Sequence, residues 1–212
     1  MLEKIKYFIR SVILPDRLFL VSKSKRDKAI YLTFDDGPVP GVTDELLALL
    51  KKHDAKATFF LLGKCAKEQS ELLSNIFEDG HTVANHSFSH ANFTRLSKEQ
   101  QETEILKTNE IIENSTNFPC KLFRAPQGRW NIQLLRVLMR KKMKAVHWNR
   151  DSMDFKKESP EKLVKRFTTQ PVKAGDIILF HDDDNRCIKA LESLVPLWQS
   201  QGFKLKALEN KL

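Results

Sequence analysis

The stretch Thr33-Phe34-Asp35-Asp36-Gly37-Pro38 places two adjacent carboxylates between an apolar run and a turn-forming Gly-Pro pair. Residues 29–34 read Ala-Ile-Tyr-Leu-Thr-Phe, and successive side chains of such a run point to opposite faces when it forms a strand. We therefore expect a strand whose carboxyl end presents Asp35 and Asp36 to opposite sides. One carboxylate can then bind a cation while its neighbour accepts a proton. Asp-Asp-Gly also occurs as an ordinary turn, so this stretch needs support from elsewhere in the chain.

Support comes from Asn85-His86-Ser87-Phe88-Ser89-His90, where the second imidazole follows the first by four positions. Side chains with this spacing meet on one face of a helical turn, which predicts that His86 and His90 chelate a metal from such a turn. A lone histidine is more often a packed or surface group. That is our interpretation of the remaining candidates, His53, His81 and His147.

Short apolar runs alternate with longer amphipathic stretches between residues 29 and 208, which predicts parallel strands joined by crossover helices. The strands are expected at residues 29–34, 57–62, 82–84, 122–124, 144–148, 176–180 and 203–207. The helices are expected at residues 43–53, 64–79, 97–114, 132–142, 160–169 and 187–201. Ser97 and Gln100 have the pattern of a capping box, which fixes the start of one helix.

Polar side chains follow the predicted strands at their carboxyl ends. They are Asp35 and Asp36, His86 and His90, Arg124, Asp151 and Asp154, and His181. In a parallel barrel the carboxyl ends of the strands open onto one face, where active sites form. We therefore expect these scattered residues to converge into one site.

Composition indicates one soluble globular domain. The chain has 212 residues, 41% of them hydrophobic and 30% charged. Its 36 basic and 27 acidic residues give a net charge of +9, which favours anionic partners, although solubility alone explains it equally well. No basic block with interleaved aromatic residues occurs, so no nucleic acid partner is expected. The odd set of cysteines lacks a CxxC pair, which predicts free thiols at Cys65, Cys120 and Cys187.

The segment 1–28 is expected to precede a catalytic domain at 29–212. Its basic residues interrupt every apolar run and no small-residue cleavage site follows, so we do not expect a secretory signal. No uncharged run reaches the roughly 18 residues needed to span a bilayer. The opening can form an amphipathic helix with Lys4, Lys6 and Arg10 around an apolar face, which either packs on the domain or lies on an anionic membrane. We expect a cytoplasmic protein, with peripheral binding to the inner face of the membrane as an alternative.

Five motifs in order resemble those of the polysaccharide deacetylases of carbohydrate esterase family 4, the chitin and peptidoglycan de-N-acetylases. The resemblance runs from about residue 29 to residue 207 and also includes Ala57-Thr58-Phe59-Phe60 with Gly63, and Gly80-His81. The motifs are residues 33–38, residues 85–90, Arg124-Ala125-Pro126-Gln127-Gly128, Trp148 with Asp151-Ser152-Met153-Asp154-Phe155, and Leu179-Phe180-His181-Asp182. The resemblance implies a distorted, incomplete (β/α) barrel of about seven parallel strands in a single domain.

The resemblance also implies a ligand set for a metal. Asp36, His86 and His90 would hold one divalent ion and leave positions open for water and the acetamide oxygen. Zinc is the expected ion, with cobalt, nickel and manganese as alternatives. The ion would polarise the carbonyl and acidify the water.

Proton transfer would fall to two further residues. Asp35 would be the general base, with Arg124 paired to it and keeping it ionised. His181 would be the general acid that protonates the departing amine, and Asp154 would orient this imidazole and raise its pKa.

The walls of the site would come from four residues. The backbone N–H of Gln127 would help to hold the oxyanion, while Leu179 and Phe155 would shape the pocket for the acetyl methyl. Trp130 is expected to be a packing residue, with stacking on a sugar ring as the alternative. Gln127 and Phe155 stand where the family usually has Tyr and Trp, which points to an unusual substrate.

The expected function is metal-dependent removal of N-acetyl groups from an amino sugar, in a glycan or a lipid-linked sugar intermediate. An O-acetyl esterase would need less from His181, because an alkoxide leaves more easily than an amine. A third hypothesis is a non-catalytic carbohydrate-binding protein or membrane-docked scaffold. The presence of Asp35, His86 and His181 argues against it. Asp182, Asp183 and Asp184 are expected to be a solvated cap on the last helix in preference to a second metal site.

Overall fold

A parallel sheet forms the centre of the protein. The computed structural model describes residues 19–20 and 27–210. The central strand β2 (Ala29–Asp35) pairs in parallel with β3 (Ala57–Leu61) on one side and with β8 (Ile177–His181) on the other. The order along the sheet is β1-β6-β5-β4-β3-β2-β8-β7, and β9 pairs with β2 off this path. The remaining strands are β1 (Phe19–Leu20), β4 (Thr82–Asn85), β5 (Leu122–Phe123), β6 (Lys144–Val146), β7 (Arg150–Asp151) and β9 (Lys204–Leu205).

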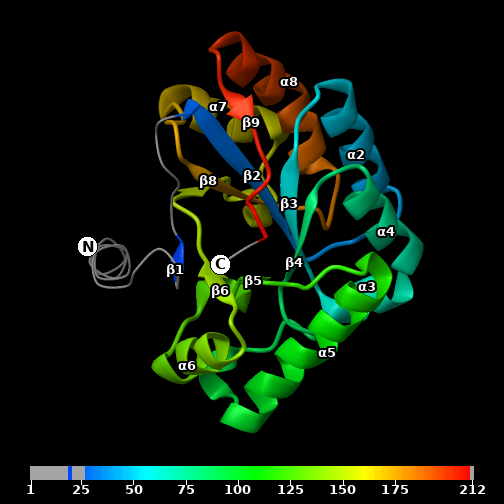
Figure 1. The fold of residues 1–212 in the computed structure, drawn as a ribbon. Helices are drawn as coiled ribbons and strands as arrows, with labels where there is room; N and C mark the ends of the chain where they lie inside the picture. The colour runs from blue at the N-terminus through cyan, green and yellow to red at the C-terminus, as the bar shows by residue number, and fades with distance from the viewer. Residues whose placement is uncertain (1–18, 21–26, 211–212) are drawn as a thin grey trace.

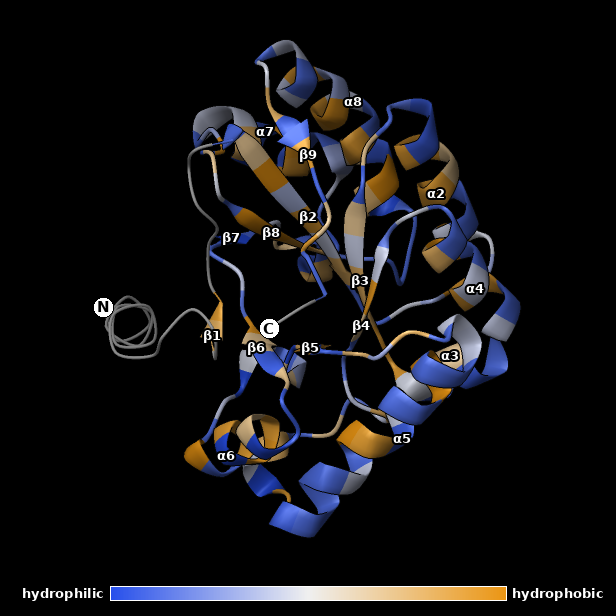
Figure 2. Cartoon of the chain, viewed as in Figure 1, coloured by the Kyte–Doolittle hydropathy of each residue, from blue (hydrophilic) through white to orange (hydrophobic). Residues whose placement is uncertain are grey.

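Helices cover the outside of the curled sheet, which stays open as an incomplete barrel (Figure 1). They are α2 (Val42–Lys52), α3 (Gly63–Glu68), α4 (Ser70–Glu78), α5 (Lys98–Thr116), α6 (Ile132–Arg140), α7 (Pro160–Thr169) and α8 (Arg186–Ser200). Figure 2 shows apolar residues along the strands and on one side of the helices, with hydrophilic residues on the other side. This pattern explains the helix positions, because an amphipathic helix must bury one face.

Strand β2 separates two layers of buried side chains. Ile30, Leu32 and Phe34 belong to the large core cluster between sheet and helices, while Ala29 and Tyr31 belong to a smaller cluster on the other face of the strand. The alternation expected from the sequence is therefore confirmed. The ring of Phe34 stacks between those of Phe59 and Phe180, at centroid distances of 5.2 and 6.0 Å. These contacts hold β2 against β3 and β8, and β2 and β8 carry two of the polar residues described below, Asp35 and His181.

The predicted barrel of parallel strands is confirmed, and the predicted strands and helices differ from the observed ones mainly at their ends. One predicted helix, 64–79, is wrong: the chain breaks at Gln69 (φ −122°, ψ 50°) into α3 and α4. Strands β1 and β7 were not predicted, because two residues cannot show a periodic pattern. The capping box is confirmed, since Ser97 Oγ accepts the Gln100 N–H at 3.3 Å and Gln100 Oε1 accepts the Ser97 N–H at 2.8 Å.

The amphipathic helix expected at the start of the chain lies outside the described residues. Within residues 19–20 and 27–210, no helix has the length and apolar character needed to cross a membrane.

Candidate active site

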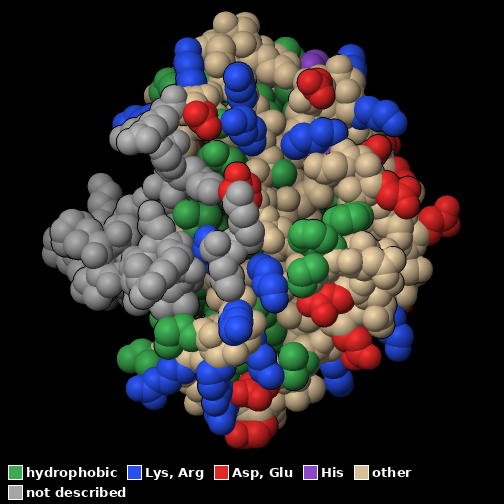
Figure 3. Space-filling view, viewed as in Figure 1, with side chains coloured by type: hydrophobic (Ala, Val, Ile, Leu, Met, Phe, Trp, Pro, Cys, Tyr) green, Lys and Arg blue, Asp and Glu red, His purple; other side chains and the backbone are tan. Residues whose placement is uncertain are grey.

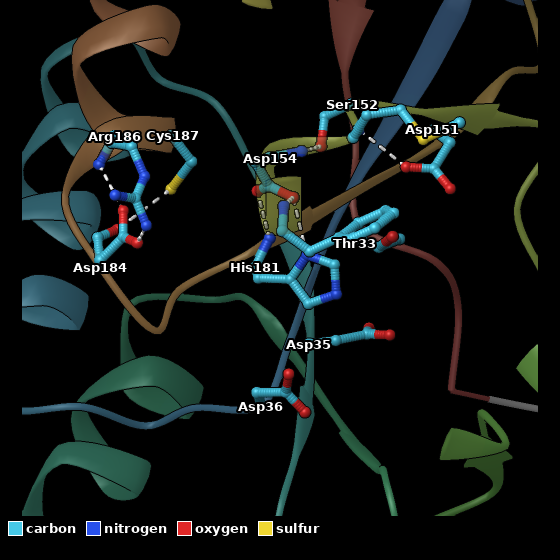
Figure 4. Close-up of polar contacts among 12 residues, drawn as sticks. Thr33, Asp35, Asp36, Asp151, Ser152, Asp154, His181, Asp184, Arg186 and Cys187 are labelled. Atoms are coloured by element: carbon cyan, nitrogen blue, oxygen red, sulfur yellow. Dashed lines mark hydrogen bonds and ion pairs between the residues drawn. The ribbon is translucent and has the colours of Figure 1, made fainter. Parts of the chain in front are cut away.

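The register of the central strands brings the predicted site residues together. Asp35 at the end of β2 is the pairing partner of His181 at the end of β8. Strands β4 and β5 end on the same side of the sheet, at Asn85 and Phe123, and are followed directly by His86 and Arg124. Figure 4 shows Asp35 on one side of the His181 imidazole, with Asp36 beyond it, and Asp154 on the other side. The carboxyl ends of the parallel strands thus form one polar centre.

Three side chains of this centre have the arrangement of a metal site. One donor atom from each of Asp36, His86 and His90 lies within 4.8 Å of the other two. The Nε2 atoms of His86 and His90 lie 3.6 and 3.5 Å from the same oxygen, Asp36 Oδ1. These distances are too long for good hydrogen bonds, and Asp36 Oδ1 is buried with no hydrogen-bond partner. A cation between these atoms would satisfy all three, so the residues fit a divalent metal.

The surroundings of the His86 ring favour its neutral, metal-binding form. Its Nδ1 lies 2.9 Å from the carbonyl oxygen of Arg124, which is the geometry of an N–H donating to that carbonyl. This bond assigns the free lone pair to Nε2, on the side of Asp36. Burial lowers the pKa of His86 to about 3, against the opposing charge of Asp36. A neutral imidazole is the form that binds metals.

The two histidines meet without a helix, so the expected helical turn is wrong. Strand β4 ends at Asn85, and residues 86–90 form a loop in which Ser87 (φ 73°) and His90 (φ 61°) adopt left-handed conformations. Asn85 Oδ1 accepts the Ser87 N–H at 2.7 Å, and Ser87 Oγ accepts the His90 N–H at 3.0 Å. These local bonds offer the backbone an alternative to helix, as Asn and Ser side chains commonly do.

A carboxylate from α5 also holds this loop, and no pattern in the sequence indicated this contact. Glu104 Oε2 accepts the N–H groups of Phe88 and Ser89, at 3.0 and 2.8 Å, and Glu104 Oε1 accepts the Ser89 hydroxyl at 2.9 Å. Its partners lie 15 and 16 residues away, on a loop whose shape cannot be read from residue spacing.

The Asp35 carboxylate lies in a closed environment. Its side chain is only 4% exposed, and Oδ1 accepts a 2.7 Å charge-assisted hydrogen bond from Arg124 Nη1. The same nitrogen donates to Thr33 Oγ1 at 2.8 Å, and the fully buried guanidinium lies 4.0 Å from the centre of the Phe60 ring. Burial raises the pKa of Asp35, and Arg124 and His181 oppose this with their positive charges. Arg124 therefore favours the ionised form of Asp35, as expected. The effect of burial is larger, so the pKa of Asp35 is raised overall.

His181 is tied to Asp154 through both carboxylate oxygens. Asp154 Oδ1 lies 2.7 Å from His181 Nδ1, and Oδ2 accepts the His181 backbone N–H at 2.7 Å (Figure 4). Burial alone would lower the pKa of the imidazole, but the hydrogen bond and charge of Asp154, with Asp35 and Asp36, raise it to about 9. The ring is therefore held as an imidazolium with Nε2 free of Asp154.

The other predicted site residues differ in exposure. Phe155 is 55% exposed, and its ring stands edge-on to His181 at a centroid distance of 6.2 Å. Leu179 is buried on β8, two residues before His181. Gln127 is exposed and left-handed (φ 56°) in the turn after Arg124. Trp130 is partly buried against the core and packs on Phe19 and Phe123, at 5.0 and 6.1 Å, as the packing interpretation expects.

The expected solvated cap at 182–184 is wrong for Asp182. This side chain is fully buried and accepts hydrogen bonds from the Gly37 N–H at 2.9 Å and from the Thr43 hydroxyl at 2.7 Å. Burial raises its pKa to about 7. Asp184 instead accepts the Arg186 N–H at 2.9 Å, at the start of α8. No local pattern in the sequence indicated this burial, because the donors to Asp182 lie 139 and 145 residues away.

Comparison with known proteins gives consistent matches. The sequence profile of the polysaccharide deacetylase family matches residues 22–146, more than half of the chain. A chitooligosaccharide deacetylase from Rhizobium leguminosarum bv. trifolii is 33% identical over 196 residues, which cover 86% of this chain and 91% of that protein.

Two solved structures give the same fold. A peptidoglycan N-acetylglucosamine deacetylase superimposes with a TM-score of 0.89 at 25% identity, and the match covers 96% of this chain and all of that one. A CE4 family pseudoenzyme from Bacillus anthracis superimposes with a TM-score of 0.84 at 28% identity, covering 91% of this chain and 68% of that one. Similarity in fold thus extends to a protein described as a pseudoenzyme, and activity must be argued from the site.

Proposed function

The chain belongs to the polysaccharide deacetylase family, and on that premise we propose that it hydrolyses the N-acetyl group of an amino sugar with a divalent metal held by Asp36, His86 and His90. The observation that carries the proposal is the pairing of Asp35 with His181 at adjacent strand ends, beside this ligand set. A buried carboxylate and an imidazolium then face the same small region from two strands. These two groups suit amide hydrolysis, because a base must take a proton from the attacking water and an acid must give one to the leaving nitrogen.

The metal, when bound, would polarise the acetamide carbonyl and lower the pKa of the attacking water. The protein's own residues would perform the proton transfers. Asp35 would accept the proton of the water, and its hydrogen bond from Arg124 at 2.7 Å aims the carboxylate. Because burial raises the pKa of Asp35, its carboxylate is a stronger base than an exposed aspartate.

His181 would donate a proton to the leaving amine. The bond from Nδ1 to Asp154 holds the ring and keeps it charged, so the Nε2 proton is available. The exposed ring of Phe155 beside it would form an apolar wall for the substrate. We further propose that the Gln127 backbone N–H supports the developing oxyanion and that Leu179 lines the acetyl pocket. The partial burial of Trp130 favours a packing role over contact with sugar.

O-acetyl ester hydrolysis is the second candidate, since the same residues would perform it. The pKa of His181, raised to about 9, favours the amide, because an amine departs only once protonated whereas an alkoxide leaves more easily. A non-catalytic role is disfavoured by the presence of Asp35 and His181 together with the full ligand set.

Acetate release tests the proposal. Purified protein would be depleted of metal by chelation, reloaded with zinc, cobalt, nickel or manganese, and offered chitooligosaccharides and an O-acetylated glycan. We expect one divalent ion per chain and zinc-dependent acetate release from the N-acetylated substrate. His86→Ala or His90→Ala should lose both metal and activity, while the control His53→Ala, remote from the ligand set, should retain both. Full turnover in metal-free protein would refute the proposal, and acetate from the O-acetylated glycan alone would select the second candidate.

We also propose that the natural substrate is a short or lipid-linked sugar at the inner face of the cytoplasmic membrane. Two features of the sequence support this location: the net charge of +9, and the basic and apolar residues of the opening segment.

A further inference from the structure

The buried carboxylate of Asp182 lies outside the groups that the proposed reaction uses. It follows His181 at the end of β8, and both of its oxygens accept hydrogen bonds from the segment after β2. The Gly37 N–H donates to Oδ1 at 2.9 Å, and the Thr43 hydroxyl donates to Oδ2 at 2.7 Å. Burying a carboxylate costs free energy unless its oxygens accept hydrogen bonds such as these. The two hydrogen bonds therefore join the segment that follows β8 to the segment that follows β2.

The two donors, Gly37 and Thr43, lie at the two ends of the loop that joins β2 to α2. Gly37 directly follows Asp36, and Thr43 lies in the first turn of α2. Thr43 Oγ1 also accepts the Val39 N–H at 2.8 Å, so the loop from 37 to 43 is closed on itself through one hydroxyl. Asp182 therefore holds the loop at its first residue and at the helix that ends it.

Asp36 directly precedes this loop and has an unusual conformation. Its φ of 83° is in the left-handed region, which is unfavourable for a residue with a side chain and must be held by its surroundings. The Asp182 carboxylate packs directly against the backbone of Gly37. A side chain at position 37 would collide with it, because a Cβ there would lie 2.2 Å from Asp182 Oδ2. On the other side, the Asp182 N–H donates to the Asp35 carbonyl at 3.3 Å, which continues the pairing of β2 with β8.

We infer that Asp182 is a positioning residue, whose carboxylate holds the loop so that Asp36 faces His86 and His90 while Asp35 stays beside His181. The inference rests on the proposed function for the meaning of these positions. It predicts that loss of the Asp182 carboxylate weakens metal binding, although this side chain does not belong to the ligand set.

Asp176 provides a matched control at the opposite end of β8. It is also buried, at 6% exposure, and both of its oxygens accept hydrogen bonds. Oδ1 accepts from Asn149 Nδ2 at 2.7 Å, and Oδ2 accepts from the Lys173 N–H at 2.8 Å. Its loss should destabilise the fold in a comparable way without moving the Asp36 loop.

The test measures zinc affinity by competition with a chromophoric chelator, and kcat for acetate release, in proteins verified as folded by circular dichroism. We expect Asp182→Ala to weaken zinc binding by about tenfold to a hundredfold, as loss of supporting contacts around a metal does. Asp182→Asn keeps an acceptor for the Gly37 N–H and should lose less. Asp176→Ala should melt at a lower temperature but bind zinc like the unaltered protein.

The inference would be overturned if folded Asp182→Ala bound zinc within about twofold of the unaltered protein, since a loss of at least about tenfold is expected. It would also be overturned if Asp176→Ala lost as much zinc affinity as Asp182→Ala. If the alanine variants do not fold, Asp182→Asn and Asp176→Asn are compared by the same assay. The inference then requires weaker zinc binding by Asp182→Asn alone. Because zinc affinity is measured without turnover, an unaltered protein that binds zinc but releases no acetate would count against the proposed function and leave this inference standing.

Discussion

Asp35 and His181 are neighbours across two strands, yet their surroundings favour opposite tasks. Asp35 is buried beside a guanidinium, whereas His181 is bonded to a carboxylate. Burial raises the pKa of Asp35, and Asp154 with the nearby carboxylates raises that of His181 to about 9 in spite of burial. Near neutral pH the imidazole therefore carries the proton, while the Arg124 guanidinium favours the carboxylate as an acceptor.

Asp35→Asn and His181→Ala should each abolish turnover while leaving metal binding nearly unchanged. Neither side chain belongs to the set of Asp36, His86 and His90. Loss of a general acid or base typically costs about a hundredfold to ten-thousandfold in rate. The measurements are kcat for acetate release and zinc content of the purified variants. A His181→Ala variant that lost less than about tenfold on an N-acetylated substrate would exclude His181 as the acid.

Asp154→Asn should move the basic limb of the pH profile. The raised pKa of His181 means that its protonated form is present below about 9 and is lost as pH rises through that value. Removing the Asp154 charge leaves only Asp35 and Asp36 to oppose the effect of burial, so the pKa of His181 should fall and the loss of kcat should begin at lower pH. Profiles of kcat between pH 5 and 10 for both proteins check this. Coincident basic limbs would show that the pKa of His181 does not control the step.

At the scale of elements, the site depends on loops held by distant helices. The His86 to His90 loop has two left-handed residues and is fixed by Glu104 of α5. Glu104→Ala should therefore weaken zinc binding by about tenfold or more, as loss of outer-shell partners does. Competition with a chelator would measure this loss. The control is Glu110→Ala, an exposed glutamate on the same helix, which should bind zinc normally. Equal affinities in the two variants would show that the loop keeps its shape without Glu104.

Sequence patterns predicted the strands and the convergence of their ends, because alternation and strand direction are local properties with global consequences. Ile30 and Tyr31 lie in different clusters, as period two requires. The pattern of His86 and His90 predicted that they would meet, but attributed this to a helix. The predicted helix was wrong because four-residue spacing does not reveal the hydrogen bonds that the side chains of Asn85 and Ser87 accept from the backbone of the loop.

Buried contacts between remote segments were the features that the sequence could not supply. Asp182 and Gly37 are 145 residues apart, and no local pattern links them. A solvated cap was the reasonable expectation for three successive aspartates, and burial of the first follows only from the packing of β8 against β2. The site residues could be identified, whereas the side chains that hold them could not.

At the scale of the whole molecule, charge is the feature that the proposed reaction does not explain. The chain carries a net charge of +9, and Lys and Arg side chains are spread over the upper and lower parts of the face drawn in Figure 3, with Asp and Glu among them. A dispersed charge of this kind attracts anionic surfaces weakly and depends on salt. Stronger attachment would need a local concentration of basic and apolar residues. The opening segment has this composition, with Lys4, Lys6 and Arg10 among apolar residues.

Changing Lys4, Lys6 and Arg10 to Glu should therefore abolish binding to anionic vesicles. Each basic residue near such a surface contributes about 1 kcal/mol, so the three together contribute about 3 kcal/mol, a loss of more than a hundredfold in affinity. Flotation with vesicles that contain phosphatidylserine, at low and at physiological salt, measures the effect.

The matched control makes the same change in charge on exposed lysines elsewhere, at Lys162, Lys165 and Lys173. If net charge alone attracts the protein to vesicles, this variant should lose binding as fully as the variant in the opening segment. If the opening segment is the anchor, the control should float like the unaltered chain, because its three altered residues lie outside residues 1–28 and leave Lys4, Lys6 and Arg10 unchanged. Equal flotation of both variants, or no flotation of the unaltered chain at low salt, would show that the substrate reaches this enzyme without an anchor in the opening segment.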